Sequence, residues 1–375
     1  MDSIRLQKLK ESPMFQLSLG SKELFHSNFL YWLWKAEPDA FWKIMEQFDI
    51  RISDKDSLEV KREWKHFDLS IVHVHKKKDT VVFDDVLAVI ENKVKSVPRK
   101  DQLEEYSKTI AAIDKKGCKK ILLSLIESDW GKTEGWDNYS YEKYKDIIKQ
   151  ILDSSIVGDT YNRSIITDYY NMIEALATFK KEWTHERFAS MRYLDIFDNP
   201  SINDYKELRI NDLRQKMIFS KMFSILEQEL GKKLGKENLK KGKTVEQILS
   251  ETKTEEIKLA IGFGMTNATG FIDIKVNIEN KYILGIQLQG DQYRHYIEYG
   301  KEPTQEPNLN KFKDLFNHGD IYSTKSNKIC SFKNKNKEKT FYYVYQNKDD
   351  SVCRKTIGDV INQIVADVEY LMKKY

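Results

Sequence analysis

Hydrophobic residues recur along the chain at two spacings, and these spacings predict the elements of the fold. Short runs rich in β-branched residues predict strands, and apolar residues three and four positions apart predict helices. In the first half of the chain we expect strands over residues 58–64, 67–74, 80–83, 86–90 and 120–126. We expect helices there over residues 22–34, capped by Ser21, and over residues 39–48, 99–113, 141–152 and 165–181.

The order of these elements predicts a mixed sheet. The first four strands follow one another closely, with a polar break at residues 75–79, which is typical of an antiparallel meander. A helix then separates the strand at 86–90 from the strand at 120–126, which implies a right-handed crossover and a parallel pair. We therefore expect an α/β core with helices on the faces of a mixed sheet.

The second half is less regular. It predicts a long helix over residues 210–230, a β-hairpin over 271–274 and 283–289, and a strand over 340–345. We place the boundary so that residues 1–183 form the first domain and residues 184–375 a C-terminal α+β domain that binds or positions a substrate. The hairpin faintly repeats the first half, with Gln287 and Gln289 on one strand face, but we interpret it as a hairpin with a polar face.

Lysines gather in two stretches of the second half. Residues 231–243 carry six lysines among three glycines, which predicts a flexible basic loop, and residues 325–339 carry a second cluster. Either stretch could contact a phosphate backbone. Solvated loops in a lysine-rich protein are an equally good interpretation.

Composition narrows the class of protein. A hydrophobic fraction of 40% over 375 residues is enough for real cores, and a net charge of +4 is too close to balance to indicate a nucleic-acid binder by itself. Three cysteines without CxxC spacing argue against a disulfide framework and a structural zinc. Neither a signal peptide nor an apolar run of membrane-spanning length is evident, so we expect a cytoplasmic protein that does not bind membranes.

The candidate chemistry lies at the end of the strand over residues 86–93. Because strand side chains alternate, Glu91 and Lys93 point to one face and Asn92 to the other. Asp68 stands at the start of a neighbouring strand. A buried strand that brings an acid and a base to one spot requires a reason, since unpaired buried charge is costly. Asp68, Glu91 and Lys93 together indicate a hydrolase site for a hard metal ion.

Two further positions extend this pattern. Glu23 lies on the first predicted helix on one stripe with Ser27, although an acid in a first turn is also favoured simply by the helix dipole. Gln102 and Tyr106 lie one turn apart on the helix that follows the Glu-Asn-Lys segment.

This ordered set of a helix acid, a strand acid, Glu-x-Lys and a glutamine-bearing helix resembles the PD-(D/E)XK nuclease superfamily. The resemblance covers roughly the first half of the chain, and Phe67 stands where the motif's name has proline. It implies a restriction-endonuclease-like core, nucleic acid as substrate with DNA favoured, and a role in bacterial restriction or phage defence. The segment around Trp136 and Tyr139–Tyr141 is similar to one bacterial branch.

The chemistry of phosphodiester hydrolysis gives each residue an expected role. Asp68 and Glu91 would supply carboxylates to Mg²⁺ or Mn²⁺, with the backbone carbonyl of Asn92 as a third oxygen. Lys93 would orient or deprotonate the attacking water. Glu23 would complete the metal shell, and Gln102 would orient the nucleophile or contact a phosphate.

Alternatives remain open on the sequence. Glu91 and Lys93 could form an ordinary salt bridge, but that leaves Asp68 and Gln102 unexplained. A catalytically silent nucleic-acid-binding protein and a protein–protein adaptor of the same fold are the two competing functions. The sequence also leaves open endonuclease or exonuclease action, DNA or RNA, and a single chain or a homodimer.

Overall fold

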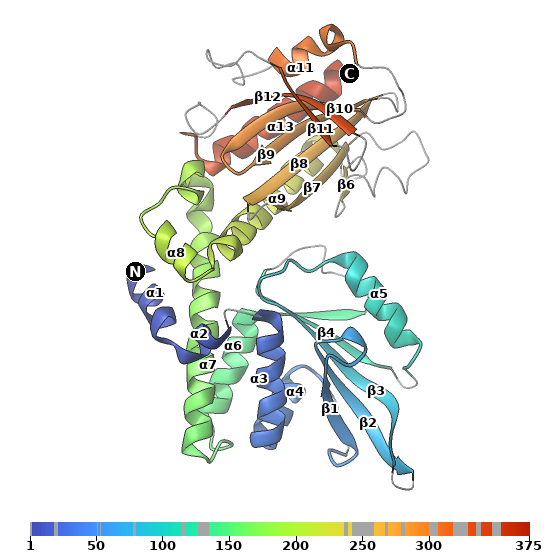
Figure 1. The fold of residues 1–375 in the computed structure, drawn as a ribbon, viewed down its shortest axis with the longest axis vertical. Coiled ribbons are helices and arrows are strands. Elements are labelled where there is room, and N and C mark those ends of the chain that lie inside the picture. The colour runs from blue at the N-terminus through green and yellow to red at the C-terminus, as the bar shows by residue number, and fades with distance from the viewer. Residues whose placement is uncertain are drawn as a thin grey trace. The chain divides into compact units, whose positions relative to one another are not determined.

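The chain forms two compact units (Figure 1). The first contains Met1–Glu182 and Asp204–Leu213, and the second contains Trp183–Asn203 and Arg214–Tyr375. The computed structural model describes residues 2–18, 22–50, 52, 54–77, 80–114, 117–126, 135–235, 239–241, 259–266, 269–278, 282–299, 307–317, 329–334, 339–346 and 354–375. Ser21, the expected helix cap, lies outside these residues.

The first unit alternates helices and strands around one sheet. Its helices are α1 (Asp2–Glu11), α2 (Pro13–Ser18), α3 (Lys22–Ala36), α4 (Pro38–Gln47), α5 (Lys100–Ala111), α6 (Tyr141–Asp153) and α7 (Thr160–Trp183), which ends one residue past the unit's boundary. Its strands are β1 (Leu58–Arg62), β2 (Leu69–Lys77), β3 (Thr80–Lys93), β4 (Lys119–Ser124) and β5 (Trp136–Ser140). The short helix α8 (Ile202–Glu207) crosses the boundary between the units.

The five strands form one mixed sheet in the order β1-β2-β3-β4-β5. β1, β2 and β3 pair antiparallel, whereas β3–β4 and β4–β5 pair parallel. Helix α5 makes the connection between the parallel strands β3 and β4. The predicted α/β core with a mixed sheet is therefore confirmed.

One detail of the strand prediction is wrong. The segments 80–83 and 86–90 belong to the single strand β3, and β2 continues through residues 75–77, where we expected a polar break. His75, Lys76 and Lys77 pair with Val82, Val81 and Thr80 of β3, so the ladder continues through these polar residues; the register shifts earlier, after Ile71 and after His73. Such bulges let a strand carry an extra residue without ending the sheet.

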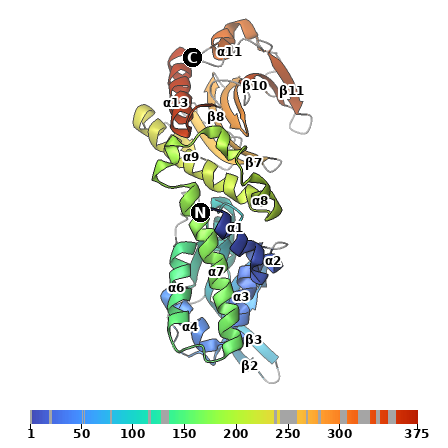
Figure 2. The same ribbon diagram turned by 90° about the vertical axis from the view of Figure 1, so that its left-hand side faces the viewer.

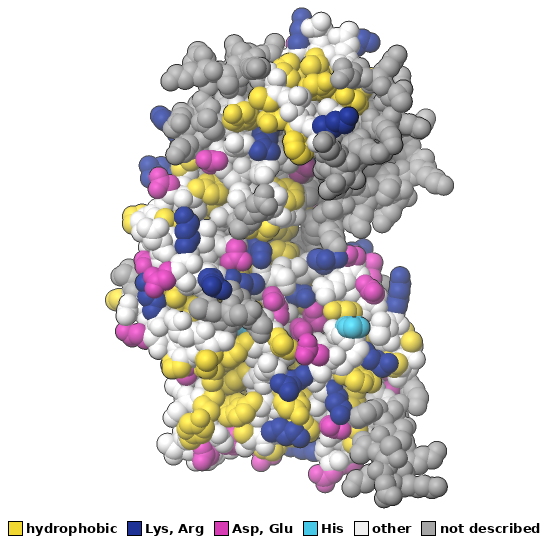
Figure 3. Space-filling view, viewed as in Figure 1, with side chains coloured by type: hydrophobic (Ala, Val, Ile, Leu, Met, Phe, Trp, Pro, Cys, Tyr) yellow, Lys and Arg dark blue, Asp and Glu magenta, His cyan; other side chains and the backbone are white. Residues whose placement is uncertain are grey.

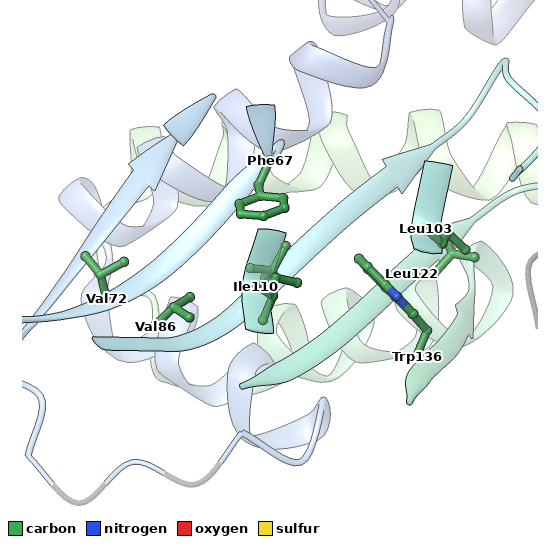
Figure 4. Close-up of a cluster of buried hydrophobic side chains, with 8 residues drawn as sticks. Phe67, Val72, Val86, Leu103, Ile110, Leu122 and Trp136 are labelled. Carbon is green, nitrogen blue, oxygen red and sulfur yellow. The ribbon is translucent and has the colours of Figure 1, made fainter. Parts of the chain in front are cut away.

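The apolar side chains of this sheet pack against α5 on one face (Figure 4). The buried cluster on this side consists of Phe67, Val72, Val86, Val89, Leu103, Ile110, Leu122 and Trp136. Figure 4 shows α3, α4 and the green helices α6 and α7 behind the sheet, on its other face. The two faces together bury β3 and β4, so that polar groups on these strands need partners inside the protein.

The second unit is built on a seven-stranded sheet in the order β11-β12-β10-β9-β8-β7-β6. These strands are β6 (Leu239–Lys241), β7 (Leu259–Thr266), β8 (Thr269–Ile278), β9 (Tyr282–Gln289), β10 (Gln292–Tyr299), β11 (Cys330–Asn334) and β12 (Lys339–Gln346). Only β6–β7 is a parallel pair. The unit also contains α9 (Asn211–Leu234, mostly in this unit), α11 (Lys313–Asn317) and α13 (Ile357–Lys374).

The two faces of this sheet differ. Helices α9 and α13 lie on one side of it (Figure 2). Phe223 of α9 contacts Phe263 of β7, and the carboxylate of Asp367 in α13 accepts a hydrogen bond from the Tyr293 hydroxyl of β10. The other face carries the alternate residues, which include most of the polar side chains of β8, β9 and β10.

The expected flexible basic loop over residues 231–243 is wrong where the structure describes it. Lys232 and Lys233 belong to the last turn of α9 and pair with Glu229 and Glu369. Lys240 and Lys241 belong to β6. Basic residues are favourable in the last turn of a helix, which explains why α9 continues past Gly231. Residues 236–238 and 242–243 lie outside the described part, as do 325–328 and 335–338 of the second cluster.

Among the described helices, none combines the length and the hydropathy needed to cross a membrane. The described cysteines are Cys118 and Cys330, and they form no disulfide with each other.

Candidate functional site

Asp68, Glu91 and Lys93 come together at one end of the first unit's sheet. Glu91 and Lys93 are the last residues of β3 on one face, and Asp68 directly precedes β2. Because Leu69 pairs with Ile90 across the antiparallel ladder, the start of β2 lies beside the end of β3. The register of this one strand pair brings together residues more than 20 positions apart.

Glu91 is the most buried charged group of the cluster. Its side chain is 2% exposed, and its Oε1 atom lies 2.6 Å from Lys93 Nζ. The other oxygen, Oε2, is buried and has no hydrogen-bond partner in the described part of the chain. Burial, and then the neighbouring charge of Asp68, raises the pKa of Glu91 to about 7. The site therefore holds a carboxylate whose negative charge is not fully compensated by protein groups.

Lys93 and Asp68 complete the charged cluster. Although burial opposes its charge, the adjacent Glu91 holds the pKa of Lys93 above its ordinary value, so the ammonium form is favoured. Asp68 Oδ2 accepts a hydrogen bond from the backbone N–H of Asn92 at 2.7 Å. Burial nevertheless raises the pKa of Asp68. Two acids and one base thus lie together, and the three carry one excess negative charge when both acids are ionised.

Asn92 points to the opposite face of β3, as the alternation predicts. It is fully buried; its Nδ2 donates to Ser27 Oγ at 2.8 Å, and the Tyr141 hydroxyl donates to its Oδ1 at 3.4 Å. Ser27 belongs to α3 and Tyr141 begins α6. These contacts fix the backbone of the residue between Glu91 and Lys93 from the far side of the sheet.

Glu23 of α3 contacts the loop that follows β3. Its Oε1 accepts hydrogen bonds from the backbone N–H of Lys95 at 3.0 Å, from that of Ser96 at 2.9 Å, and from Ser96 Oγ at 3.0 Å. Although burial opposes its charge, these donors, Ser96 foremost, hold the pKa of Glu23 below its ordinary value. The sequence did not predict this contact, since backbone N–H groups carry no sequence signal.

Gln102 and Tyr106 approach from α5, on the face that Glu91 and Lys93 share. Gln102 Nε2 donates to the Tyr106 hydroxyl at 2.9 Å, and the Tyr106 ring packs edge-on against Phe67 at 5.3 Å. Burial, and next the charge of Glu91, raises the pKa of Tyr106. The pair stands one turn apart on the predicted helix.

The oxygen atoms present suit a hard divalent cation that is bound by only a few atoms of the protein. Among the described residues, no three His, Cys, Asp or Glu side chains gather closely enough to form a metal cage. Two carboxylate oxygens of the cluster, Asp68 Oδ1 and the buried Glu91 Oε2, have no hydrogen-bond partner there. Mg²⁺ is commonly held by one or two carboxylates and completes its shell with waters and substrate phosphates. The cluster matches that donor set.

Comparison with known proteins identifies the family of the first unit. A model of the PD-(D/E)XK nuclease superfamily matches residues 14–207, which is more than half of the chain. No curated protein and no solved structure matches the chain. The matched range includes the sheet, Asp68, the Glu-Asn-Lys segment and Gln102. The chain belongs to the PD-(D/E)XK nuclease superfamily.

Proposed function

We propose that this protein is a divalent-metal-dependent nuclease that hydrolyses phosphodiester bonds of DNA. The observation that carries the proposal is the buried Oε2 atom of Glu91, which has no hydrogen-bond partner among the described residues and belongs to a carboxylate on which the charge of Asp68 acts. An ordinary structural salt bridge has no need of a second acid or of an unsatisfied carboxylate oxygen. A cation at this position would compensate the excess negative charge.

Asp68 and Glu91 would hold Mg²⁺ or Mn²⁺, together with the backbone carbonyl of Asn92. When bound, the ion supplies charge neutralisation at the phosphoryl oxygens and an acidified water. Lys93, kept in its ammonium form by Glu91, orients the attacking water and balances negative charge that develops at the phosphate. We therefore assign Lys93 an orienting role in preference to that of a base.

Glu23 and Gln102 support this centre. Glu23 holds the backbone of residues 95–96 directly after the Glu-Asn-Lys segment through its Oε1 atom. Its second oxygen is then the one that would face a metal-bound water. Gln102 uses its amide N–H to contact the Tyr106 hydroxyl, so its carbonyl oxygen is the atom that would orient a nucleophile.

The test is cleavage by the full chain of linear, circular and single-stranded DNA and of RNA, each with Mg²⁺, with Mn²⁺ and with EDTA. We expect metal-dependent cleavage of DNA by the wild-type protein and none by the Glu91→Gln variant. Cleavage of circular DNA identifies endonuclease action, since an exonuclease requires an end. Because Glu104 lies exposed on α5, the Glu104→Gln variant is the matched control and should cleave normally.

A protein that binds nucleic acid but cleaves none of these substrates with either metal would contradict the enzyme and favour the silent binding protein. Preferential cleavage of RNA would support the proposed phosphodiester hydrolysis but would identify RNA, and not DNA, as the substrate. The proposed role in restriction or phage defence requires a separate test. Cells that express the wild-type protein should resist phage infection better than cells that express Glu91→Gln.

A further inference from the structure

The face of the second unit's sheet that points away from α9 and α13 carries a compact group of polar and aromatic side chains. Arg294 of β10 pairs in register with Gln287 of β9 on one side and with Tyr345 of β12 on the other. Gln292 pairs with Gln289, and Tyr343 lies next to Tyr345 on the same strand face. We call these six residues the platform: Gln287, Gln289, Gln292, Arg294, Tyr343 and Tyr345.

Arg294 at the centre of the platform is held by neutral groups. Its Nη1 donates to Gln287 Oε1 at 2.9 Å and to Gln289 Oε1 at 2.5 Å, and its Nε donates to Gln292 Oε1 at 3.0 Å. Within the described part of the chain, Arg294 forms no hydrogen bond or ion pair with a carboxylate. The guanidinium is thus fixed in place by three amides while its positive charge remains available to an anionic ligand.

The glutamines present donors at the same place. Since their carbonyl oxygens accept from Arg294, their amide NH₂ groups remain as donors, and none of these NH₂ groups has a hydrogen-bond partner among the described residues. Amides held in this way can donate to acceptors on the edges of nucleobases. The platform therefore combines one fixed positive charge with several directed donors.

The tyrosines add aromatic surface. The Tyr343 and Tyr345 rings are 6.0 Å apart, and the Arg294 guanidinium lies 5.7 Å from the centre of the Tyr343 ring. Both rings are half-buried, and neither hydroxyl has a partner among the described residues. Figure 3, viewed from the side of β11 and β12, shows hydrophobic side chains, a class that includes tyrosine, and basic side chains on the surface of this unit.

A glycine lets an aromatic ring lie close to the sheet next to the platform. The ring of Tyr296 lies directly over Gly285 of β9, where a Cβ atom would come within 1.9 Å of the ring. The Tyr296 hydroxyl donates to Asp273 at 2.7 Å, which fixes the ring against the sheet. A glycine in a strand interior often marks such a close approach. The Tyr296 ring is therefore held against β9, next to Tyr343, with which Tyr296 pairs in register.

We infer that the platform binds single-stranded nucleic acid, with unstacked bases lying on Tyr343 and Tyr345 and a phosphate or base edge at Arg294. Single strands are favoured over a duplex because the rings offer stacking faces, which paired bases cannot reach. A peptide partner is a poorer match, since the six platform residues are glutamines, an arginine and tyrosines, and none of them is aliphatic. The inference rests on the proposed function, because the substrate of a nuclease is a nucleic acid.

The test is binding of a fluorescent oligonucleotide of about 20 nucleotides to the full chain, followed by anisotropy. EDTA is present, so that no cleavage occurs. Single-stranded DNA, single-stranded RNA and the matching duplex are compared. We expect tighter binding of the single strands, and a loss of about 5- to 100-fold in affinity for Tyr343→Ala and for Tyr345→Ala.

Two further variants separate stacking from stability. Tyr345→Phe keeps the ring and should retain affinity within about twofold, since stacking requires the ring and not the hydroxyl. Tyr342→Ala lies on the same strand but on the opposite face and should bind normally. Any one of three results would overturn the proposal that the platform binds single strands. These are unchanged affinity in Tyr345→Ala, an equal loss of affinity in Tyr342→Ala, and binding of the duplex alone. Because cleavage is measured separately with Mg²⁺, failure of the platform leaves the nuclease proposal standing, and the converse also holds.

Discussion

The raised pKa of Glu91 predicts that metal binding depends steeply on pH. A carboxylate must lose its proton to hold a metal ion, and burial next to Asp68 places that ionisation at about pH 7. Below pH 7, protons compete with the metal for the same oxygen atoms. Above pH 8, the site is already ionised and the competition ends.

The size of the effect follows from the titration of one group. With a pKa of about 7, roughly one tenth of the Glu91 side chains are ionised at pH 6 and nine tenths at pH 8. The Kd for Mn²⁺ should therefore be about tenfold weaker at pH 6 than at pH 8. Binding should release about 0.9 proton at pH 6, about 0.5 at pH 7 and about 0.1 at pH 8.

The same shift has a consequence for the metal-free protein. The folded state binds the Glu91 proton more tightly than the unfolded state, so the free energy of unfolding should fall as the pH rises from about 4.5 to about 7. A shift of about 2.5 units corresponds to about 3 kcal/mol. Denaturant unfolding in EDTA should show this slope, and the slope should be shallower in Glu91→Gln.

Isothermal titration calorimetry with Mn²⁺ measures both quantities. Titrations in buffers of different ionisation enthalpy give the number of protons released, and titrations at several pH values give the Kd. In Glu91→Gln the metal should bind more weakly, with a flatter dependence on pH. A Kd that stays constant between pH 6 and pH 8, or unchanged metal binding in Glu91→Gln, would refute the placement of the ion at Glu91.

Three further variants test the surroundings of Glu91. Asp68→Asn and Lys93→Ala should each lower cleavage by orders of magnitude, and the double variant should be scarcely worse, because the residues act as one unit; additive losses would contradict this. Glu23→Gln should raise the metal concentration needed for cleavage and speed hydrogen exchange at the Ser96 amide; normal exchange would show that the contact is dispensable. Ser27→Ala leaves the buried Asn92 amide without its partner and should cost about 1–3 kcal/mol in denaturant unfolding; an unchanged midpoint would argue against that bond.

The order of elements in the first unit was determined by the sequence. The hydrophobic run at residues 86–90 and the helix before residues 120–126 were sufficient to predict the parallel pair β3–β4, because a crossover helix allows few other arrangements. The alternation of side chains likewise predicted that Asn92 would point away from Glu91 and Lys93. These properties are local, so the sequence carries them directly.

The limits of the strands were determined by pairing. The sequence predicted a polar break at residues 75–77, yet they belong to β2, because they pair with Val82, Val81 and Thr80 of β3. The sequence predicted a loop at Lys232 and Lys233. Instead, both residues extend α9 and pair with Glu229 and Glu369. Local composition cannot predict a strand-pairing or ion-pair partner that is distant in the sequence.

The chemical state of the candidate site also required the tertiary structure. The sequence supplied Asp68, Glu91 and Lys93, but only the fold shows that Glu91 keeps one buried oxygen without a partner and that Glu23 holds the backbone at Ser96. Similarly, Gln287 and Gln289 were visible as a polar strand face, whereas their grouping around Arg294 depends on the pairing of β9 with β10. Residue types are fixed by the sequence, whereas burial, distance and hydrogen bonding arise only when distant segments pack together.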